Sequence, residues 1–299
     1  MKSLKQKKKH IFLSAHLDDA VFACGGLIAK AAALGCPVDV ITLYAREVDL
    51  DTLPAQQKKS AIYEQRKEED RVALEPFGIT PIWADFTERF LRPPWLPNAL
   101  HVFNTPQEGM FHDFDNAASI EPYIVKLIQD NPDAQFFVSL GVGNHYDHVE
   151  LFLFSLKAAI DLNQLHRFTF YEEGYAMGTR MRKRHPVTQN ATWKWWQSPA
   201  SRNIQWLIMS NLMASRAKGK PVFEYLPEKY RNLQWTVKPE SIQGYEEAKL
   251  EAMRKYKTQY KMLGGDGMFK KILPQYHKYW GGAEPYWYAQ NISNLESAA

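Results

Sequence analysis

The sequence predicts an α/β fold in which helices cover both faces of a doubly wound, mostly parallel sheet. Short apolar runs rich in β-branched and aromatic residues alternate with longer segments at helical spacing, which is typical of consecutive βαβ units. The runs contain few polar residues, as expected for strands that are buried on both faces. The chain has 299 residues, of which 45% are hydrophobic, and it is therefore long enough to bury a large core.

The first βαβ unit consists of a strand at 10–15 (HIFLSA), an alanine-rich helix at 19–34 and a strand at 38–44 (VDVITLY). The same alternation continues along the chain and predicts a helix at 59–77, a strand at 79–84, a helix at 119–130, a strand at 135–140, a helix at 149–162 and a strand at 167–171. In such sheets, ligands bind beyond the carboxyl ends of the strands. Functional residues are therefore expected at those positions.

The alternation ends near residue 175. The remaining part predicts helices at 202–217 and 240–262 and an added strand at 233–238. It contains no linker rich in Pro, Gly or Ser and no internal repeat, so we expect one domain over 1–299, with a core at about 9–175 and a C-terminal elaboration at about 176–299. The proline-rich segment 86–118 predicts a long irregular loop, and such loops are often functional.

Composition and charge exclude several classes of protein. The 37 basic and 33 acidic residues give a net charge of only +4, which does not indicate a nucleic-acid partner. No stretch approaches the roughly 20 apolar residues of a membrane span. The lysine-rich N-terminus precedes a short apolar run and is expected to be a solvated tail, not a signal peptide. With only Cys24 and Cys36 available, disulfides cannot staple the chain, and a cytoplasmic location is predicted.

The stretch AHLDDAVFACGG follows the first predicted strand. His16 leaves the tip of the strand, and Asp18 and Asp19 open the next helix, whose dipole favours negative charge. An aspartate that only caps the helix is the alternative for one of these acids. Burying unpaired carboxylates costs several kcal/mol or more, so we expect a group that neutralises them.

A second polar cluster follows the fourth predicted strand, in SLGVGNHYDHVE, and contains His145, Asp147 and His148. Because the carboxyl ends of parallel strands meet at one edge of the sheet, the two clusters are expected to converge. His16, Asp19 and His148 would then supply two imidazoles and one carboxylate, the usual ligand set of a catalytic zinc ion with one open position. Fe(II) or another divalent metal accepts the same set.

Asp18 and His145 are expected to face the metal without binding it. A carboxylate beside a metal suits the role of general base, which we assign to Asp18. His145, held and kept basic by Asp147, would stabilise the oxyanion or give a proton to the leaving amine. Asp147 as an ordinary turn residue is the alternative.

These two motifs resemble those of the PIG-L/LmbE-like family of metal-dependent N-deacetylases. The family's first motif has the form (P/A)H-x-DD followed by a glycine pair, and its second has the form H-x-DH. Arg66 and Glu69 resemble the family's R-x-x-E helix, and Lys249 to Gln259 resemble its late helix. The resemblance implies a Rossmann-like fold, the metal ligands His16, Asp19 and His148, Asp18 as general base, and His145 as the acid or oxyanion partner. Leu17 and Tyr146 stand where many members have proline.

The resemblance also implies a zinc-dependent hydrolase that removes an acetyl group from the nitrogen of an N-acetylglucosamine-type sugar or glycoconjugate. Arg66 resembles the arginine that reaches the sugar; the alternative is a surface arginine that pairs with Glu69 or Asp70. Tryptophan faces suit sugar rings, and the candidates are Trp83, Trp95, Trp193, Trp195 and Trp196. The basic cluster at 180–185 could hold a phosphate, although a solvated loop is favoured.

Two other classes of function compete with this interpretation. Two histidines and a carboxylate also form the site of non-heme iron dioxygenases, but those sites usually pair H-x-D on a β-barrel strand with a distant histidine. A non-catalytic, Rossmann-like glycan- or nucleotide-binding module is suggested by Gly25 and Gly26. However, G-x-G-x-x-G is absent, and the glycine pair more simply allows close packing of a helix on the sheet.

Overall fold

The computed structural model describes residues 7–103, 120–175, 177–216 and 222–291, and its centre is a seven-stranded sheet of order β3-β2-β1-β4-β5-β7-β6. The first five strands are parallel, whereas β7 is antiparallel to both β5 and β6. The strands are β1 (His10–Ser14), β2 (Val38–Thr42), β3 (Ile82–Trp83), β4 (Gln135–Ser139), β5 (Phe168–Tyr171), β6 (Leu233–Ser241) and β7 (Ala283–Asn291). The predicted doubly wound, mostly parallel α/β fold is therefore confirmed.

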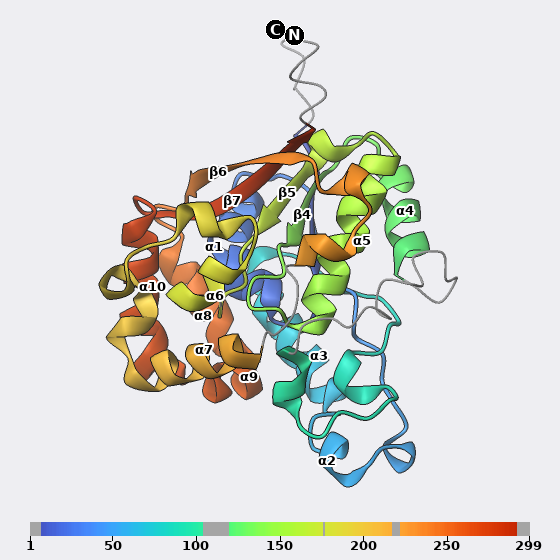
Figure 1. Cartoon of the computed structure of the whole chain (residues 1–299), viewed down its shortest axis with the longest axis vertical. Coiled ribbons are helices and arrows are strands. Elements are labelled where there is room, and N and C mark those ends of the chain that lie inside the picture. Colours follow the sequence, from blue (N-terminus) through green and yellow to red (C-terminus); the bar gives the residue numbers. More distant parts are fainter. Residues whose placement is uncertain (1–6, 104–119, 176, 217–221, 292–299) are drawn as a thin grey trace, which may run out of the picture.

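Helices cover both faces of this sheet, with α4 and α5 on one side and α1, α8 and α10 on the other (Figure 1). The helices are α1 (Asp19–Ala33), α2 (Ala55–Lys58), α3 (Tyr63–Leu74), α4 (Glu121–Asp130), α5 (Tyr146–Asp161), α6 (Thr179–Arg184), α7 (Ile204–Arg216), α8 (Glu246–Lys255), α9 (Lys257–Met262) and α10 (Gly265–Tyr279). Two buried apolar clusters, one for each face, fill the space between sheet and helices. Among the described residues, none of the helices combines the length and apolar character needed to cross a bilayer.

The C-terminal part differs most from the sequence prediction. The helix expected over 240–262 is divided into α8 and α9 at Tyr256, whose hydroxyl donates to Asp70 on α3. Helix α10 and strand β7 were not predicted, and β7 inserts between β5 and the expected strand β6. The C-terminal elaboration thus completes the sheet. Of the predicted loop at 86–118, residues 104–119 lie outside the described residues, and 3₁₀ turns occupy Arg89–Leu91 and Ala99–Phe103.

The glycine pair lets helix α1 approach its neighbours closely. A Cβ at Gly26 would lie 2.7 Å from Ile242 Cδ1, and one at Gly25 would lie 2.9 Å from Lys249 Cγ. The close packing is therefore against α8 and against Ile242, the residue that follows sheet strand β6. Lys249 Nζ donates to Glu284 Oε1 at 2.7 Å, and this carboxylate accepts from the Gly26 N–H at 3.1 Å. The buried ion pair joins α8, β7 and α1.

Strands β1 and β4 lie side by side at the centre of the sheet, with Leu13 paired to Val138. The chain leaves β1 into α1 on one face and leaves β4 into α5 on the other. This reversal of direction opens a crevice at the carboxyl ends of the two strands, where ligands bind in open α/β sheets. Both predicted polar clusters follow these strands.

Candidate metal centre

The turn after β1 leaves both aspartates available for chemistry. The Ser14 hydroxyl accepts from the Ala20 N–H at 3.1 Å and thus caps the start of α1. Asp18 occupies the N-cap position but makes no side-chain cap hydrogen bond, and Asp19 Oδ2 accepts from the His16 N–H at 2.8 Å. Neither acid is used as a simple helix cap, which was the alternative function.

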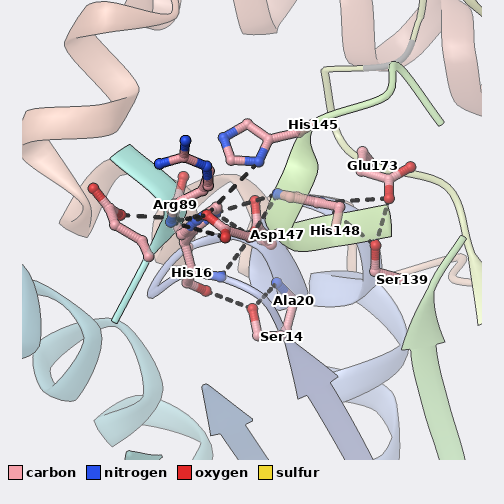
Figure 2. A network of polar contacts seen from close by, with 12 residues as sticks. Ser14, His16, Ala20, Arg89, Ser139, His145, Asp147, His148 and Glu173 are labelled. Carbon is pink, nitrogen blue, oxygen red and sulfur yellow. Dashed lines mark hydrogen bonds and ion pairs between the residues drawn. The ribbon is translucent and has the colours of Figure 1, made fainter. Parts of the chain in front are cut away.

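The second cluster lies at the start of α5, which begins at Tyr146 and not at 149 as predicted. Asp147 and His148 are therefore in the first helical turn. The turn before them is fixed by Glu173, which follows β5 and accepts from the backbone N–H groups of Gly141 at 2.6 Å and Val142 at 2.7 Å. Figure 2 shows His16, Asp147 and His148 facing one another, with Glu173 and Ser139 on the outer side of His148. The two distant turns thus converge.

Three potential ligand atoms form a nearly equilateral triangle. His16 Nδ1, Asp19 Oδ2 and His148 Nε2 are each 3.2 Å from the other two. A tetrahedral zinc ion with bonds of about 2.0–2.1 Å separates its nitrogen and oxygen ligands by about 3.3 Å. The spacing of the three atoms therefore fits one divalent cation.

Hydrogen bonds on the outer side of the two rings fix which nitrogens face this triangle. His16 Nε2 lies 3.0 Å from Asp147 Oδ2, and a proton on this nitrogen would leave a lone pair on Nδ1. His148 Nδ1 lies 3.4 Å from both Ser139 Oγ and Glu173 Oε1, and a proton on Nδ1 would leave the lone pair on Nε2. Two imidazole lone pairs and a carboxylate oxygen then point at one another. A shared cation satisfies all three, and outer carboxylates of this kind are usual behind metal-bound histidines.

A set of three imidazoles is the other possible donor set. His16, His145 and His148 each offer a ring nitrogen within 4.8 Å of the others. This group is wider than the 3.2 Å triangle that includes Asp19 Oδ2. The chemistry of the donors and their spacing therefore favour His16, Asp19 and His148.

Burial and neighbouring charges separate the two adjacent aspartates. Burial, together with the charge of Asp19, raises the pKa of the Asp18 carboxyl to about 7. Burial acts in the same direction on Asp19, but His148 and His16 outweigh it and hold the pKa of this carboxyl below its usual range. Burial also lowers the pKa of His145, and His16 and His148 add to the effect. Asp18 is thus suited to exchange a proton near neutral pH, whereas Asp19 stays ionised.

The site opens into a cavity of about 640 Å³. Arg66 is buried in its wall, with NH2 3.5 Å from Asp18 Oδ1 and NH1 3.7 Å from Glu88 Oε2. Because Arg66 is buried, it is not a surface arginine. Glu69, the partner that this alternative assumed, instead accepts from the Thr258 hydroxyl at 2.7 Å. Three polar atoms beside the cavity are buried and meet no hydrogen-bond partner among the described residues: Arg66 Nε, His145 Nδ1 and Tyr175 Oη. Such atoms are typical of a site that binds a polar ligand.

Asp147 lies in a different place from the one expected. Its Oδ2 is 3.0 Å from His16 Nε2 but 3.9 Å from His145 Nδ1, and both carboxylate oxygens accept from the Arg89 N–H. The expected hydrogen bond to His145 is therefore absent, because the start of α5 directs the carboxylate towards the turn after β1. Asp147 orients His16.

Sequence reasoning missed two carboxylates at this site. Glu173 directly follows β5 in the run YEEGY, and the same signal of polar residues after a buried strand would have identified it. Glu88, which lies 3.8 Å from His16 Nε2, belongs to an irregular segment without periodicity. Only the tertiary structure brings Glu88 to the site.

The other predicted binding groups do not contribute to the cavity. Its lining includes none of the candidate tryptophans whose side chains are described, whereas Trp206, which the sequence did not single out, does line it. The basic segment is helix α6 and not a solvated loop. Within it, Arg182 is fully buried against Glu172 and Trp193, and His185 after it hydrogen-bonds the Leu140 carbonyl at 3.0 Å. Arg182 and His185 thus pack against the core, whereas Arg180, Lys183 and Arg184 are exposed, as expected for a solvated segment.

Comparisons with known proteins agree with this geometry. A family model described as PIG-L, GlcNAc-PI de-N-acetylase, matches residues 11–159. A deacetylase of teicoplanin biosynthesis, in its bog complex, is 19% identical, with a TM-score of 0.64 over 94% of this chain and 97% of that one. The A40926 pseudoaglycone deacetylase Dbv21 is 17% identical, with a TM-score of 0.63 over 95% of this chain and 98% of that one.

The zinc-inhibited form of the teicoplanin deacetylase Orf2 is also similar, at 18% identity and a TM-score of 0.63 over 94% and 97% of the two chains. At such identities the likeness of structures establishes the shared fold. No curated protein sequence matches this chain. The family model covers both motifs, including the two turns that meet at the candidate metal centre. The chain therefore belongs to the PIG-L/LmbE-like family of deacetylases.

Proposed function

We propose that this chain is a divalent-metal-dependent hydrolase, with zinc as the metal, that removes an acetyl or other acyl group from the amide nitrogen of an N-acetylglucosamine-type sugar or glycoconjugate. The observation that carries the proposal is the 3.2 Å triangle of His16 Nδ1, Asp19 Oδ2 and His148 Nε2. Membership of a deacetylase family supports the reaction. The cytoplasmic location and the single-domain organisation stay predictions from the sequence.

In this proposal His16, Asp19 and His148 hold the cation. When bound, a divalent ion supplies Lewis-acid polarisation of the amide carbonyl and makes water a better nucleophile at neutral pH. The carboxylates of Asp147 and Glu173 keep the two imidazoles in the tautomers that ligation requires.

Asp18 acts as the general base. Its carboxylate accepts the proton of the attacking water, and a pKa near neutrality suits a group that must bind this proton and then release it. Arg66 lies 3.5 Å from Asp18 Oδ1 and keeps the carboxylate directed into the cavity. The Nε–H of the same guanidinium meets no hydrogen-bond partner among the described residues and can donate to the sugar.

His145 acts on the other side of the scissile bond. Its Nδ1 is buried without a hydrogen-bond partner among the described residues, and burial lowers the pKa of the ring, so the neutral imidazole is suited to donate a hydrogen bond to the carbonyl oxygen as negative charge develops there. Asp147 is a positioning residue for His16 in this account, with a weaker influence on His145 across 3.9 Å.

The test is the release of free amine from a panel of N-acetylglucosaminyl compounds, measured on purified protein, on chelator-treated protein and after zinc or ferrous iron is returned. We expect release that the chelator abolishes and the metal restores. Release that persists in metal-free protein would refute the metal-dependent mechanism. No release from any member of the panel, by protein with one bound metal per chain, would refute the proposed substrate class.

A further inference from the structure

One buried hydroxyl group beside the cavity has no role in the proposed function. Tyr175 follows the end of β5 and lines the cavity together with His16 and His145. Its Oη is buried and meets no hydrogen-bond partner among the described residues. A buried tyrosine hydroxyl normally finds a partner, because leaving it unpaired destabilises the fold. An unpaired hydroxyl at the wall of a cavity is therefore expected to bind a polar group of the ligand.

Close packing fixes the position of this tyrosine. A Cβ at Gly143 would lie 2.8 Å from Tyr175 Cε2, so the glycine leaves room for the ring against the turn before α5. The chain before the tyrosine is held as well. A Cβ at Gly174 would lie 2.9 Å from Phe22 Cβ, and the Glu173 carboxylate accepts two backbone N–H groups of the same turn. Tyr175 is therefore held in place before a ligand binds, as catalysis by fixed hydrogen-bond donors requires.

Tyr175 and His145 pack around the same two rings. The Tyr175 ring meets the rings of His148 and Phe103 edge-on, with centroid separations of 5.6 and 6.0 Å. The centroid of the His145 ring lies 4.9 Å from that of His148 and 5.2 Å from that of Phe103. Tyr175 Oη and His145 Nδ1 are both buried without a partner in the described part of the chain. Two potential hydrogen-bond donors thus border the same part of the cavity, beside a proposed metal ligand.

We propose that Tyr175 donates a hydrogen bond to the carbonyl oxygen of the scissile amide and, with His145, stabilises the negative charge that develops on this oxygen. The inference rests on the proposed function and adds a catalytic residue to the same site. When water attacks the amide carbon, the C=O double bond becomes a single bond and its electron pair moves to the oxygen. A phenol is protonated at neutral pH, so the Tyr175 O–H donates to this oxygen and keeps its proton.

The first experiment measures the kinetics of Tyr175→Phe in the metal-loaded protein. This substitution keeps the ring contacts and removes only the hydroxyl. Loss of one fixed donor to an oxyanion typically lowers kcat about 100- to 1,000-fold, and we expect such a loss with KM within about threefold of that of the unmodified protein. An unchanged kcat would overturn the proposal, whether KM is unchanged or raised, because the hydroxyl would then be structural or would bind only the ground state of the substrate.

Tyr171→Phe is the matched control, because Tyr171 is buried at the end of β5 and does not line the cavity. Its hydroxyl donates to the Leu13 carbonyl at 2.8 Å. We expect this variant to keep kcat within about twofold but to lower the melting temperature by about 2–4 °C. Tyr175→Phe loses no such hydrogen bond among the described residues, so its melting temperature is expected to stay the same or rise. Equal losses of kcat in the two variants would contradict the proposal.

A binding measurement separates this inference from the proposed function. Calorimetric titration of the metal-loaded protein uses methyl β-D-glucosaminide, which has no carbonyl oxygen, and its N-methylphosphonyl derivative, whose tetrahedral phosphoryl group carries negative charge. Hydrogen bonds to charged groups are the stronger ones. We therefore expect Tyr175→Phe to weaken binding of the phosphonyl derivative about 10- to 100-fold and binding of the amine less than about twofold.

The expected result supports the hydrogen-bond donor even if no amine is released from any substrate. Equal weakening of the two ligands, or no weakening of either, would overturn this inference. Amine release by the unmodified protein would in that case leave the proposed function intact.

Discussion

Replacing Asp147 by asparagine tests how the site prepares its first ligand. Asp147 Oδ2 accepts from His16 Nε2 at 3.0 Å and from the Arg89 N–H at 3.1 Å, and Oδ1 accepts from the same N–H at 2.9 Å. Every neighbour is therefore a donor. An asparagine must direct its NH₂ group at one of them, or His16 must change tautomer, which places the proton on Nδ1 and removes the lone pair that faces the cation.

Loss of an outer carboxylate of this kind typically weakens metal affinity 10- to 100-fold, which corresponds to about 1.4–2.7 kcal/mol of binding free energy. We expect Asp147→Asn to fall in this range, with activity partly restored at high metal concentration. The assay is competition for zinc with a chelating indicator of known affinity, combined with the metal dependence of kcat/KM.

Glu150→Gln is the matched control, because Glu150 lies one turn further along α5 and bonds Tyr44 and Arg92 at 2.5 and 2.8 Å instead of a site histidine. We expect its zinc affinity to stay within twofold of the unmodified protein. An Asp147→Asn protein with unchanged affinity, or equal losses in both variants, would refute the proposed role of the carboxylate behind His16.

Three further results are expected. Asp18→Asn should bind one metal per chain yet lose at least about 100-fold in kcat, because general-base catalysis contributes 10²–10⁴-fold; near-normal kcat would exclude Asp18 as the base. Burial lowers the pKa of His185 to about 3, so below pH 6.5 the imidazole of His185 takes up a proton in the unfolded chain but not in the folded chain. The free energy of unfolding therefore decreases as the pH falls, by about 2 kcal/mol at pH 5. The free energies of unfolding of the protein and of His185→Gln, measured by urea titration, should diverge below pH 6.5, and a parallel dependence on pH would contradict this. Gly26→Ala forces a Cβ within 2.8 Å of Ile242 and should destabilise the fold by about 1–3 kcal/mol. Gly267→Ala, with nothing within 4 Å of its Cβ, should be neutral or stabilising by up to about 1 kcal/mol. Shifts of the same sign in the calorimetric melting temperatures of the two variants would refute the packing argument.

Local sequence patterns were sufficient for the parallel half of the fold. Buried parallel strands are short apolar runs, and each is followed by a helix of recognisable periodicity, so β1, α1, β2 and β4 fall within a few residues of their predicted positions. Strand β7 carries AEPYWYAQN, in which a charged residue and a proline interrupt the apolar pattern. Its position in the sheet depends on the buried pair of Glu284 with Lys249, which no local pattern reveals.

The candidate site was predictable for a related reason. Polar residues that directly follow buried strands are conspicuous, and parallel topology brings them to one edge, so His16, Asp19 and His148 could be grouped before their distances were known. The direction of the Asp147 carboxylate depends on where α5 begins, which is uncertain by a few residues in any sequence prediction. Glu88 and Trp206 come from segments whose packing is decided by the tertiary structure alone.

The most direct test of the account is anomalous diffraction from crystals of the zinc-loaded protein, recorded on both sides of the zinc absorption edge. We expect one strong peak at bonding distance, about 2.0–2.2 Å, from His16 Nδ1, Asp19 Oδ2 and His148 Nε2 together. A peak bound by His145 in place of Asp19, or the absence of a peak at this edge of the sheet, would contradict it.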